Sequence, residues 1–397
     1  MKHRIVAAGL AAVLMLTATP VYASADLITL LPFPIEHSEN EDTRVLTLEE
    51  AFRMAQRNNS SIDTLNDTIT FIEQQRRSLV IDELNAWRFG AGLLDHSAAQ
   101  LGRAIRSIDV TQTNAPTTQQ TLESLSSFLV LNNVNMIYAI ELDLVFERET
   151  VAFNAVTLQH TELRNELGLA SDADVTDARR ELESSRAALR AMEITLESLN
   201  VSLNHLIGLP SATNVRVKHH PQLDIGRISD RVRNINHYAD RQTHMDPTIE
   251  TLRRQVRDAQ FNYNSWQDWV QNWAPSQPGV AMNWETNITD RASMLNALNA
   301  AGRELTDSID NMQENIRQAY MQLRQLEEQR EILLITLQRA HDAYATASVN
   351  LTAGMVTQHQ VESARLAIMM AEGLLIGNSI AYENLLFRFE RPFLLAI

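Results

Sequence analysis

A heptad pattern of apolar residues in the run Glu304–Leu351 constrains this chain more than any other feature. The apolar positions alternate at spacings of four and three residues without a slip. They are Leu305, Ile309, Met312, Ile316, Ala319, Leu323, Leu326, Arg330, Leu333, Leu337, Ala340, Tyr344, Ala347 and Leu351, of which only Arg330 is charged. A hydrophobic period of 3.5 residues is typical of helices that pack as a left-handed coiled coil.

The chain turns after this run and returns with the same spacing. Gly354 is the kind of residue that ends a helix, and Thr357 with Gln360 makes a capping pair that starts the next one. The spacing then continues from Val361 to Phe389. We therefore expect an antiparallel helical hairpin here, in which Arg330 either pairs with an acid across an interface or marks an exposed edge.

A near-copy of the return run lies earlier in the chain. Gly168 lies 186 residues before Gly354, and the capping pair Ser171 and Asp174 lies 186 residues before Thr357 and Gln360. The apolar positions that match at this offset are Val175 and Val361, Ala178 and Ala364, Leu182 and Ile368, Leu189 and Leu375, and Leu199 and Leu385. Residues 60–63 recur at 247–250, 187 apart. We infer an internal duplication.

This duplication predicts a mainly α fold of elongated antiparallel coiled-coil hairpins in two tandem structural repeats. The expected organisation is a signal peptide at 1–25, an extended leader at 26–45, a first helical repeat at 46–210, a linker at 211–245 and a second helical repeat at 246–397. A short strand is expected within the linker, at 214–218.

Local signals predict where the helices begin and end. Thr47 and Glu50 form a capping box, and Asp246 with Pro247 opens the second repeat. We expect a break at the glycines of 90–92, a polar breaker at 109–120 around Pro116, and a helix from 121 to 166. In the second repeat we expect a helix to 273, a breaker at 275–279 and the next helix from about residue 290.

The N-terminus reads as a secretory signal. Lys2 and Arg4 precede an apolar core, and 23–25 is an A-x-A cleavage site before Asp26. The chain has no cysteine, which excludes disulfides and thiolate metal sites. No later stretch of about 18 apolar residues is evident, so we expect no transmembrane helix. The formal charge of -15 argues against nucleic acid as a partner.

Several motifs together resemble the TolC-like outer membrane efflux proteins. Residues 46–51 (LTLEEA), with Ala55 and the asparagines at 58–59, look like that family's N-terminal signature. Gly168 to Ser171 with Asp174, Val175 and Ala178 resembles its first helix-turn-helix tip, and 203–208 (LNHLIG) resembles its end-of-repeat motif. The second half matches more loosely, and the resemblance covers most of 46–391.

The resemblance implies a homotrimer whose repeats assemble a hollow α-helical barrel in the cell envelope, at the outer membrane and periplasm. It also implies that the helical tips contact a periplasmic adaptor and an inner-membrane pump. The tip residues would be Gly168, Leu169, Ala170, Ser171, Gly354, Met355, Val356 and Thr357. The alternative is that these turns only reverse the helices, which their glycines and caps already explain.

The sequence departs from the family at its membrane end. Family members insert a β-hairpin in each half, and each spanning strand needs about 9–11 residues. The breakers at 109–120 and 274–289 are too short for two such strands each, so we expect little or no β-barrel. Trp266, Trp269, Trp273 and Trp284 crowd the second breaker, either as a membrane-interface belt or as a packed aromatic cap.

Motifs for catalysis or cofactor binding are not found. The sequence lacks a nucleophile elbow, a phosphate-binding loop and a dinucleotide fingerprint, so we expect no enzyme and no cofactor. Histidines gather near the linker without an acid at ligand spacing, so no metal site is expected. Asp172, Asp174 and Asp177 either line a pore constriction or form an acidic helix start.

Two functional hypotheses follow. The first is an exported channel or conduit subunit for efflux or secretion of small molecules or proteins. The second is an exported structural or protein-interaction protein, soluble outside the cytoplasm, that kept the helical body and lost the membrane barrel.

Overall fold

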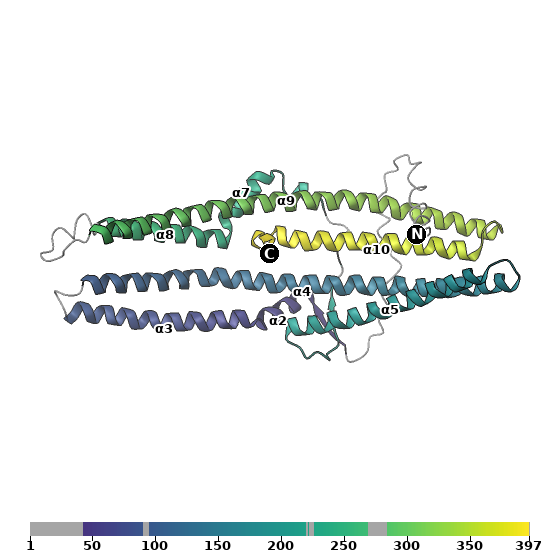
Figure 1. The fold of residues 1–397 in the computed structure, drawn as a ribbon, viewed down its shortest axis with the longest axis horizontal. Coiled ribbons are helices and arrows are strands. Elements are labelled where there is room, and N and C mark those ends of the chain that lie inside the picture. The colour runs from purple at the N-terminus through teal and green to yellow at the C-terminus, as the bar shows by residue number, and fades with distance from the viewer. Residues whose placement is uncertain (1–42, 90–94, 220, 222–225, 269–283, 397) are drawn as a thin grey trace. The chain divides into compact units, whose positions relative to one another are not determined.

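The computed structural model describes residues 43–89, 95–219, 221, 226–268 and 284–396, and they are almost entirely helical (Figure 1). The elements are β1 (Arg44–Thr47), α2 (Leu48–Arg57), α3 (Ser60–Phe89), α4 (Asp95–Glu166), α5 (Asp172–Ile207), β2 (Val215–Lys218), α6 (Ile228–Arg231), α7 (Ile235–Met245), α8 (Pro247–Asp268), α9 (Trp284–Thr352), α10 (Gln358–Phe389) and the 3-10 helix η4 (Pro392–Ala396). The predicted signal peptide and most of the leader lie outside the described residues.

Two long helical hairpins make up the body of the fold. Helix α4 runs to the turn at 167–171 and α5 packs back along it, while α9 and α10 do the same around the turn at 353–357 (Figure 1). With 72 residues, α4 is about 108 Å long at 1.5 Å per residue. Helix α3 packs on α4, and α8 packs on α9. The predicted mainly α fold of antiparallel hairpins is confirmed.

The predicted heptad seam lies inside the second hairpin. Every seam position from Leu305 to Leu351 is buried or half-buried, and Ile316 and Leu323 are fully buried. Arg330 is half-buried and lies close enough to Tyr382 of α10 to lower the pKa of that phenol, against the stronger raising effect of burial. The charged break in the seam therefore faces α10.

The two halves of the chain bury equivalent positions. Val130 of α4 and Ile316 of α9, 186 residues apart, are both fully buried. Leu203 of α5 and Phe389 of α10 have the same separation, and both are at most 2% exposed. Val130 and Leu203 belong to the apolar core of the first half, and Ile316 and Phe389 belong to that of the second. These matches are consistent with duplication of one helical unit.

Helices α4 and α10 join the two hairpins through polar contacts. The amide of Asn135, which is fully buried, donates to Glu383 Oε2 at 3.2 Å and to Asn384 Oδ1 at 3.0 Å. His219, just after β2, lies 3.0 Å from the same Glu383 oxygen. Arg365 of α10 forms an ion pair with Glu149 of α4 at 3.1 Å.

A pair of short strands links the leader to the linker. β1 and β2 pair in parallel, with Arg44 opposite Val215 and Thr47 opposite Lys218. β2 lies where a short strand was expected. β1 was not predicted, because its partner is remote in the sequence and the strand has only four residues. Thr47 ends β1 and also caps α2 through the predicted box with Glu50.

The predicted breaker at 109–120 is wrong, because α4 continues through Pro116 from Asp95. Proline removes one backbone hydrogen bond and costs a helix about 3 kcal/mol. Ala115 is buried while Pro116 is exposed, so the ring points to solvent as its neighbour packs inward. Packing along the rest of a helix this long outweighs one local loss.

The ends of the other helices near the expected membrane end differ from the prediction as well. Helix α9 begins at Trp284, earlier than residue 290, and the described part of α8 ends at Asp268. The predicted glycine break at 90–92 and the expected breaker at 275–279 both lie outside the described residues. Of the two breakers expected to be too short for a β-hairpin, 109–120 is helical, and 274–283 lie outside the described residues.

Two helices are long and apolar enough to cross a membrane by length and composition, contrary to our expectation of none. They are the part of α4 from Ala115 to Glu166, and α10. Their apolar character has a structural reason within this fold. Each packs against several other helices, and their most apolar windows are 33% buried.

The structure describes two of the four tryptophans expected at this end of the fold. Trp266 is half-buried on α8, and Trp284 is the first residue of α9. Trp269 and Trp273 lie outside the described residues. The choice between a membrane-interface belt and an aromatic cap stays a prediction.

Candidate functional site: the two helical tips

The turns that close the two hairpins have the same backbone geometry. Gly168 and Gly354 are left-handed, with φ of 71° and 72°. In the first turn the N–H of Gly168 donates to Asn165 O at 2.8 Å and that of Leu169 to Arg164 O at 2.7 Å. Gly354 and Met355 make the equivalent bonds, at 2.9 and 2.8 Å. Both turns are therefore Schellman motifs, which satisfy carbonyls at the helix end.

Each turn leads into a capped helix, as the sequence predicts. Ser171 Oγ accepts from the Asp174 N–H while the Asp174 carboxylate accepts from the Ser171 N–H. Thr357 and Gln360 make the same reciprocal pair at the start of α10. The hydrogen bonds from Ser171 lower the pKa of Asp174, because they favour the charged carboxylate.

The acidic start of α5 serves local structure. Asp174 is the cap partner, and Asp177 forms an ion pair with Arg180 at 3.2 Å. Asp172 accepts from the side chain of Asn165 at 3.1 Å. These contacts match the acidic-helix-start interpretation, and the pore-constriction interpretation gains no support from them.

The first tip has a side-chain tie that the second lacks. The Asn165 amide donates to Ala170 O at 3.0 Å and to Asp172 Oδ1, bridging the end of α4 and the start of α5. The position equivalent to Asn165 in the second tip is Leu351, which cannot donate. The two tips thus share a backbone but differ in how firmly side chains bind their arms.

Both tips expose large apolar side chains. Leu169 is 65% exposed at the first turn, and Met355 is 76% exposed at the second. Leu163 and Leu167 near the first turn and Val349 near the second are exposed as well. The sequence prediction included the turn residues but missed these three flanking positions. Leu163 and Val349 lie in the last turns of α4 and α9, and Leu167 directly follows α4. Exposed apolar groups that cluster at one end of a helix pair suit contact with another protein.

The glycines leave open space around the turns. A Cβ added at Gly168 or Gly354 would meet no atom within 4 Å. Gly208, at the end of α5, is different, because a Cβ there would lie 2.7 Å from the Asn58 side chain. Substitutions at the two tip glycines are thus limited by backbone conformation and not by crowding.

An aromatic contact joins the two hairpins near their tips. The ring of His359, at the start of α10, stacks on Phe153 of α4 with centroids 4.3 Å apart. His160, two turns further along α4, lies 6.4 Å from His359. Burial, and secondarily the neighbouring His160, lowers the pKa of His359. The sequence holds no local signal for this contact, which depends on the register of α4 against α10.

Metal ligation has no support among the residues that the structure describes. No group of three or more histidines and acids there could hold a metal ion. His219 instead contacts Glu383, and His244 contacts Arg253.

Comparison with known proteins shows similarity at the level of fold. No family model and no curated protein sequence matches the chain. Solved structures do match. A membrane protein from Pseudomonas aeruginosa is 13% identical with a TM-score of 0.65, over 87% of this chain and 93% of that one.

Two named channels match over a similar extent. The outer-membrane channel OprN is 13% identical with a TM-score of 0.62, over 87% of this chain and 89% of its own. The outer membrane protein VceC from Vibrio cholerae is 11% identical with a TM-score of 0.59, over 88% and 95%. The chain therefore has a TolC-like fold, the fold of these outer-membrane channels.

Proposed function

We propose that this protein is an exported subunit of a TolC-like conduit in the cell envelope, and that three copies assemble into a tube through which substrates pass. The observation that carries the proposal is the pair of long helical hairpins with matching tips, in a fold shared with outer-membrane channels along nearly the whole of both chains. Passage through a tube needs no catalytic group, so the work of this chain would be to form a wall.

The exposed apolar side chains support assembly between copies. Met321, Ile332 and Ile335 of α9 and Met370 and Leu374 of α10 are exposed away from the seam. In a single copy these side chains stay in water, which is unfavourable for an apolar group. Packing neighbour against neighbour would bury them.

Assembly is tested by light scattering on the mature protein in mild detergent. We expect the mass of three copies. A protein that remains a monomer at micromolar concentration contradicts the tube. A double variant, Ile332→Glu with Ile335→Glu, should weaken assembly while the matched variant Glu328→Gln, on the same helix, should not.

We further propose that both tips dock onto a periplasmic adaptor, which in turn meets an inner-membrane pump. The exposed Leu169 and Met355, each next to a turn glycine with open space around it, support this proposal. Gly168→Trp and Gly354→Trp would place bulk at the docking surface. Helix content by circular dichroism should persist, because only the strain of a left-handed non-glycine residue is added.

Loss of adaptor capture by these variants supports docking. Gly168→Asn and Gly354→Asn are matched controls, because asparagine tolerates the left-handed conformation and is small. Capture that is unchanged by tryptophan at both positions would leave the turns as simple helix reversals.

The alternative is an exported structural or interaction protein with the same helical body. Membrane fractionation separates the two proposals. Recovery with the outer membrane supports the conduit, whereas recovery only in the soluble exported fraction supports the alternative.

A further inference from the structure

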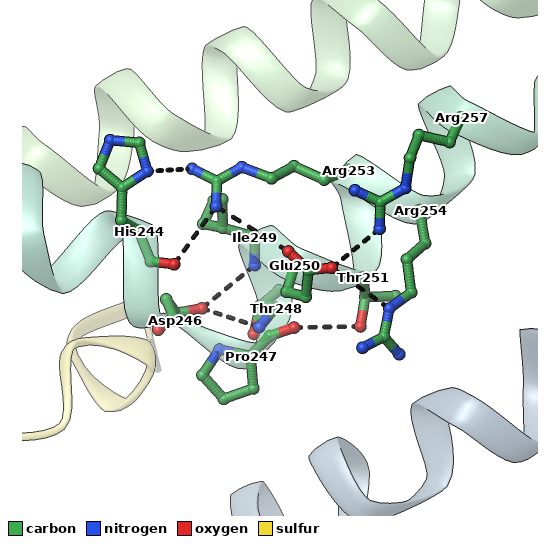
Figure 2. Close-up of polar contacts among 10 residues, drawn as sticks. All are labelled: His244, Asp246, Pro247, Thr248, Ile249, Glu250, Thr251, Arg253, Arg254 and Arg257. Carbon is green, nitrogen blue, oxygen red and sulfur yellow. Dashed lines mark hydrogen bonds and ion pairs between the residues drawn. The ribbon is translucent and has the colours of Figure 1, made fainter. Parts of the chain in front are cut away.

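A buried aspartate lies between the linker helix α7 and the first long helix of the second half. Asp246 follows α7 directly and precedes Pro247, the first residue of α8. Its Oδ1 accepts from the N–H of Thr248 at 2.8 Å and from that of Ile249 at 3.2 Å (Figure 2). The carboxyl thus caps α8 in the way its sequence position predicts.

The second oxygen of the same carboxyl is buried and receives no hydrogen bond from the described residues. Asp246 is 3% exposed, and its Oδ2 is a buried atom with no hydrogen-bond partner among the residues that the structure describes. A buried carboxylate oxygen without a donor is unfavourable, since the charge has left water and found no replacement.

The first half of the chain shows what this position looks like when it is satisfied. Asn59 precedes α3 as Asp246 precedes α8, at the offset of 187 that relates the two helix starts. Asn59 Oδ1 accepts from the Ser61 N–H at 3.0 Å, and its Nδ2 donates to Ser126 Oγ of α4 at 2.7 Å. Both polar atoms of the cap side chain are therefore used.

The second half has a different residue at the position of Ser126, the hydrogen-bond partner of Asn59. At the offset of 186 that relates α4 to α9, Ser126 corresponds to Met312, which is buried in the apolar core together with Ile249. A thioether cannot donate a hydrogen bond. The second half thus has a carboxyl where the first half has an amide, and a buried methionine where the first half has the hydroxyl that contacts that amide.

Charged groups on the neighbouring elements are engaged elsewhere. Figure 2 shows Arg253 of α8 donating to His244 O and contacting His244 Nδ1 of α7, and Glu250 accepting from Arg254 and Arg257. Other charges on these elements also have partners. Asp240 of α7 pairs with His244, and Arg241 lies over the ring of Tyr238. Arg317 of α9 donates to Asn236 and pairs with Glu314, and Glu123 of α4 accepts from Gln119.

We propose that Asp246 is a proton-binding site whose protonation, as the pH falls, stabilises the junction between α7 and α8. A protonated carboxyl keeps Oδ1 as an acceptor for the two backbone N–H groups and removes the buried charge from Oδ2. Burial raises the pKa of Asp246 above its usual value, and the hydrogen bonds from Ile249 and Thr248 offset this only in part.

The sign of the effect follows from linkage. The folded protein binds this proton at a higher pH than the unfolded chain does, so the stabilisation is complete below the unfolded pKa. It is lost as the pH rises through the folded pKa. This inference does not depend on the proposed channel role.

The test compares the full chain with Asp246→Asn, a neutral variant of the same shape that keeps the cap. Between pH 7 and pH 4 we expect amide exchange at 248–249 to slow in the wild type relative to the variant. The ratio of the exchange rate in the wild type to that in the variant should change by about tenfold for each unit by which the pKa of Asp246 in the folded protein exceeds that in the unfolded chain. Parallel pH profiles would mean that Asp246 stays ionised, with bound water on Oδ2, and would overturn the proposal.

Three further variants keep the result interpretable. Asn59→Asp with Ser126→Met places the second-half pair in the first half and should create a new acid-side stabilisation at 61–62. Asp246→Asn with Met312→Ser rebuilds the first-half pair and should protect 248–249 at neutral pH beyond the single variant. His244→Gln removes the imidazole that contacts Arg253, and the difference between wild type and Asp246→Asn must survive in that background.

Discussion

At the scale of single residues, the tips show how the same backbone turn can have different side-chain support. Both turns need glycine, because φ near +70° costs other residues about 1 kcal/mol or more. Only the first turn adds an amide tie, from Asn165. Removing that tie tests its contribution without touching the turn itself.

We predict that Asn165→Ala destabilises the first tip by about 1 kcal/mol, since each hydrogen bond of this kind contributes about 0.5–1.5 kcal/mol net. Hydrogen exchange at 169–172 should quicken about fivefold. Asn165→Leu, which places the second tip's residue at this position, should quicken exchange to a similar extent, because leucine fills the space without donating a hydrogen bond. Unchanged exchange in Asn165→Leu would show that Asn165 supports its tip only by packing.

At the scale of elements, the contact between α4 and α10 depends on a few buried polar groups. Asn135 is fully buried and donates to both Glu383 and Asn384. Its own Oδ1 is buried without a partner in the described part of the chain. Such a group gives the helix pair one favoured register, because any slip leaves more polar atoms unpaired.

We predict that Asn135→Ala lowers the free energy of unfolding by about 1–3 kcal/mol, because the half-buried acceptors Glu383 and Asn384 lose this donor. Urea unfolding followed by circular dichroism measures this. Met136→Ala, at the exposed neighbouring position, should change stability by less than about 0.5 kcal/mol. A similar loss in both variants would point to helix propensity and away from the buried contact.

A second prediction at this scale concerns pH. The lowered pKa of His359 means that the unfolded chain takes up this proton at a higher pH than the folded chain does. The stabilisation is therefore present above the usual pKa of histidine and is lost as the pH falls toward the lowered folded value. His359→Phe keeps the stacking on Phe153 and should remove this loss between pH 7 and pH 5, measured by urea unfolding. An unchanged profile would assign the acid sensitivity to other groups.

At the scale of the whole molecule, the predicted secretory signal leads to a test of where the mature chain begins. We predict that the mature chain begins at Asp26, because cleavage after an A-x-A site removes residues 1–25. N-terminal sequencing of the exported protein checks this. Ala25→Arg should block cleavage and retain the longer chain, whereas Asp26→Asn, on the other side of the site, should be processed normally.

The features of the fold that could be predicted from sequence are those encoded by residues close together in the chain. The seam from Leu305 to Leu351, the left-handed glycines and the capping boxes at Ser171 and Thr357 were all predictable. Each is encoded within a few residues, either as a hydrophobic period or as a side chain bonding the backbone beside it. Pro116 was misread because a local penalty was not weighed against packing along all of α4.

The amino-acid sequence by itself determined the hairpins, their turns and the duplication. Only the tertiary structure decided which faces of the hairpins meet, that β1 pairs with β2, that His359 stacks on Phe153, and that Asp246 is buried while its counterpart Asn59 is satisfied. The physical reason is that the period of a helix fixes which side chains share a face, but not which other face covers them. That choice is made by the summed packing and polar satisfaction of segments remote in the chain.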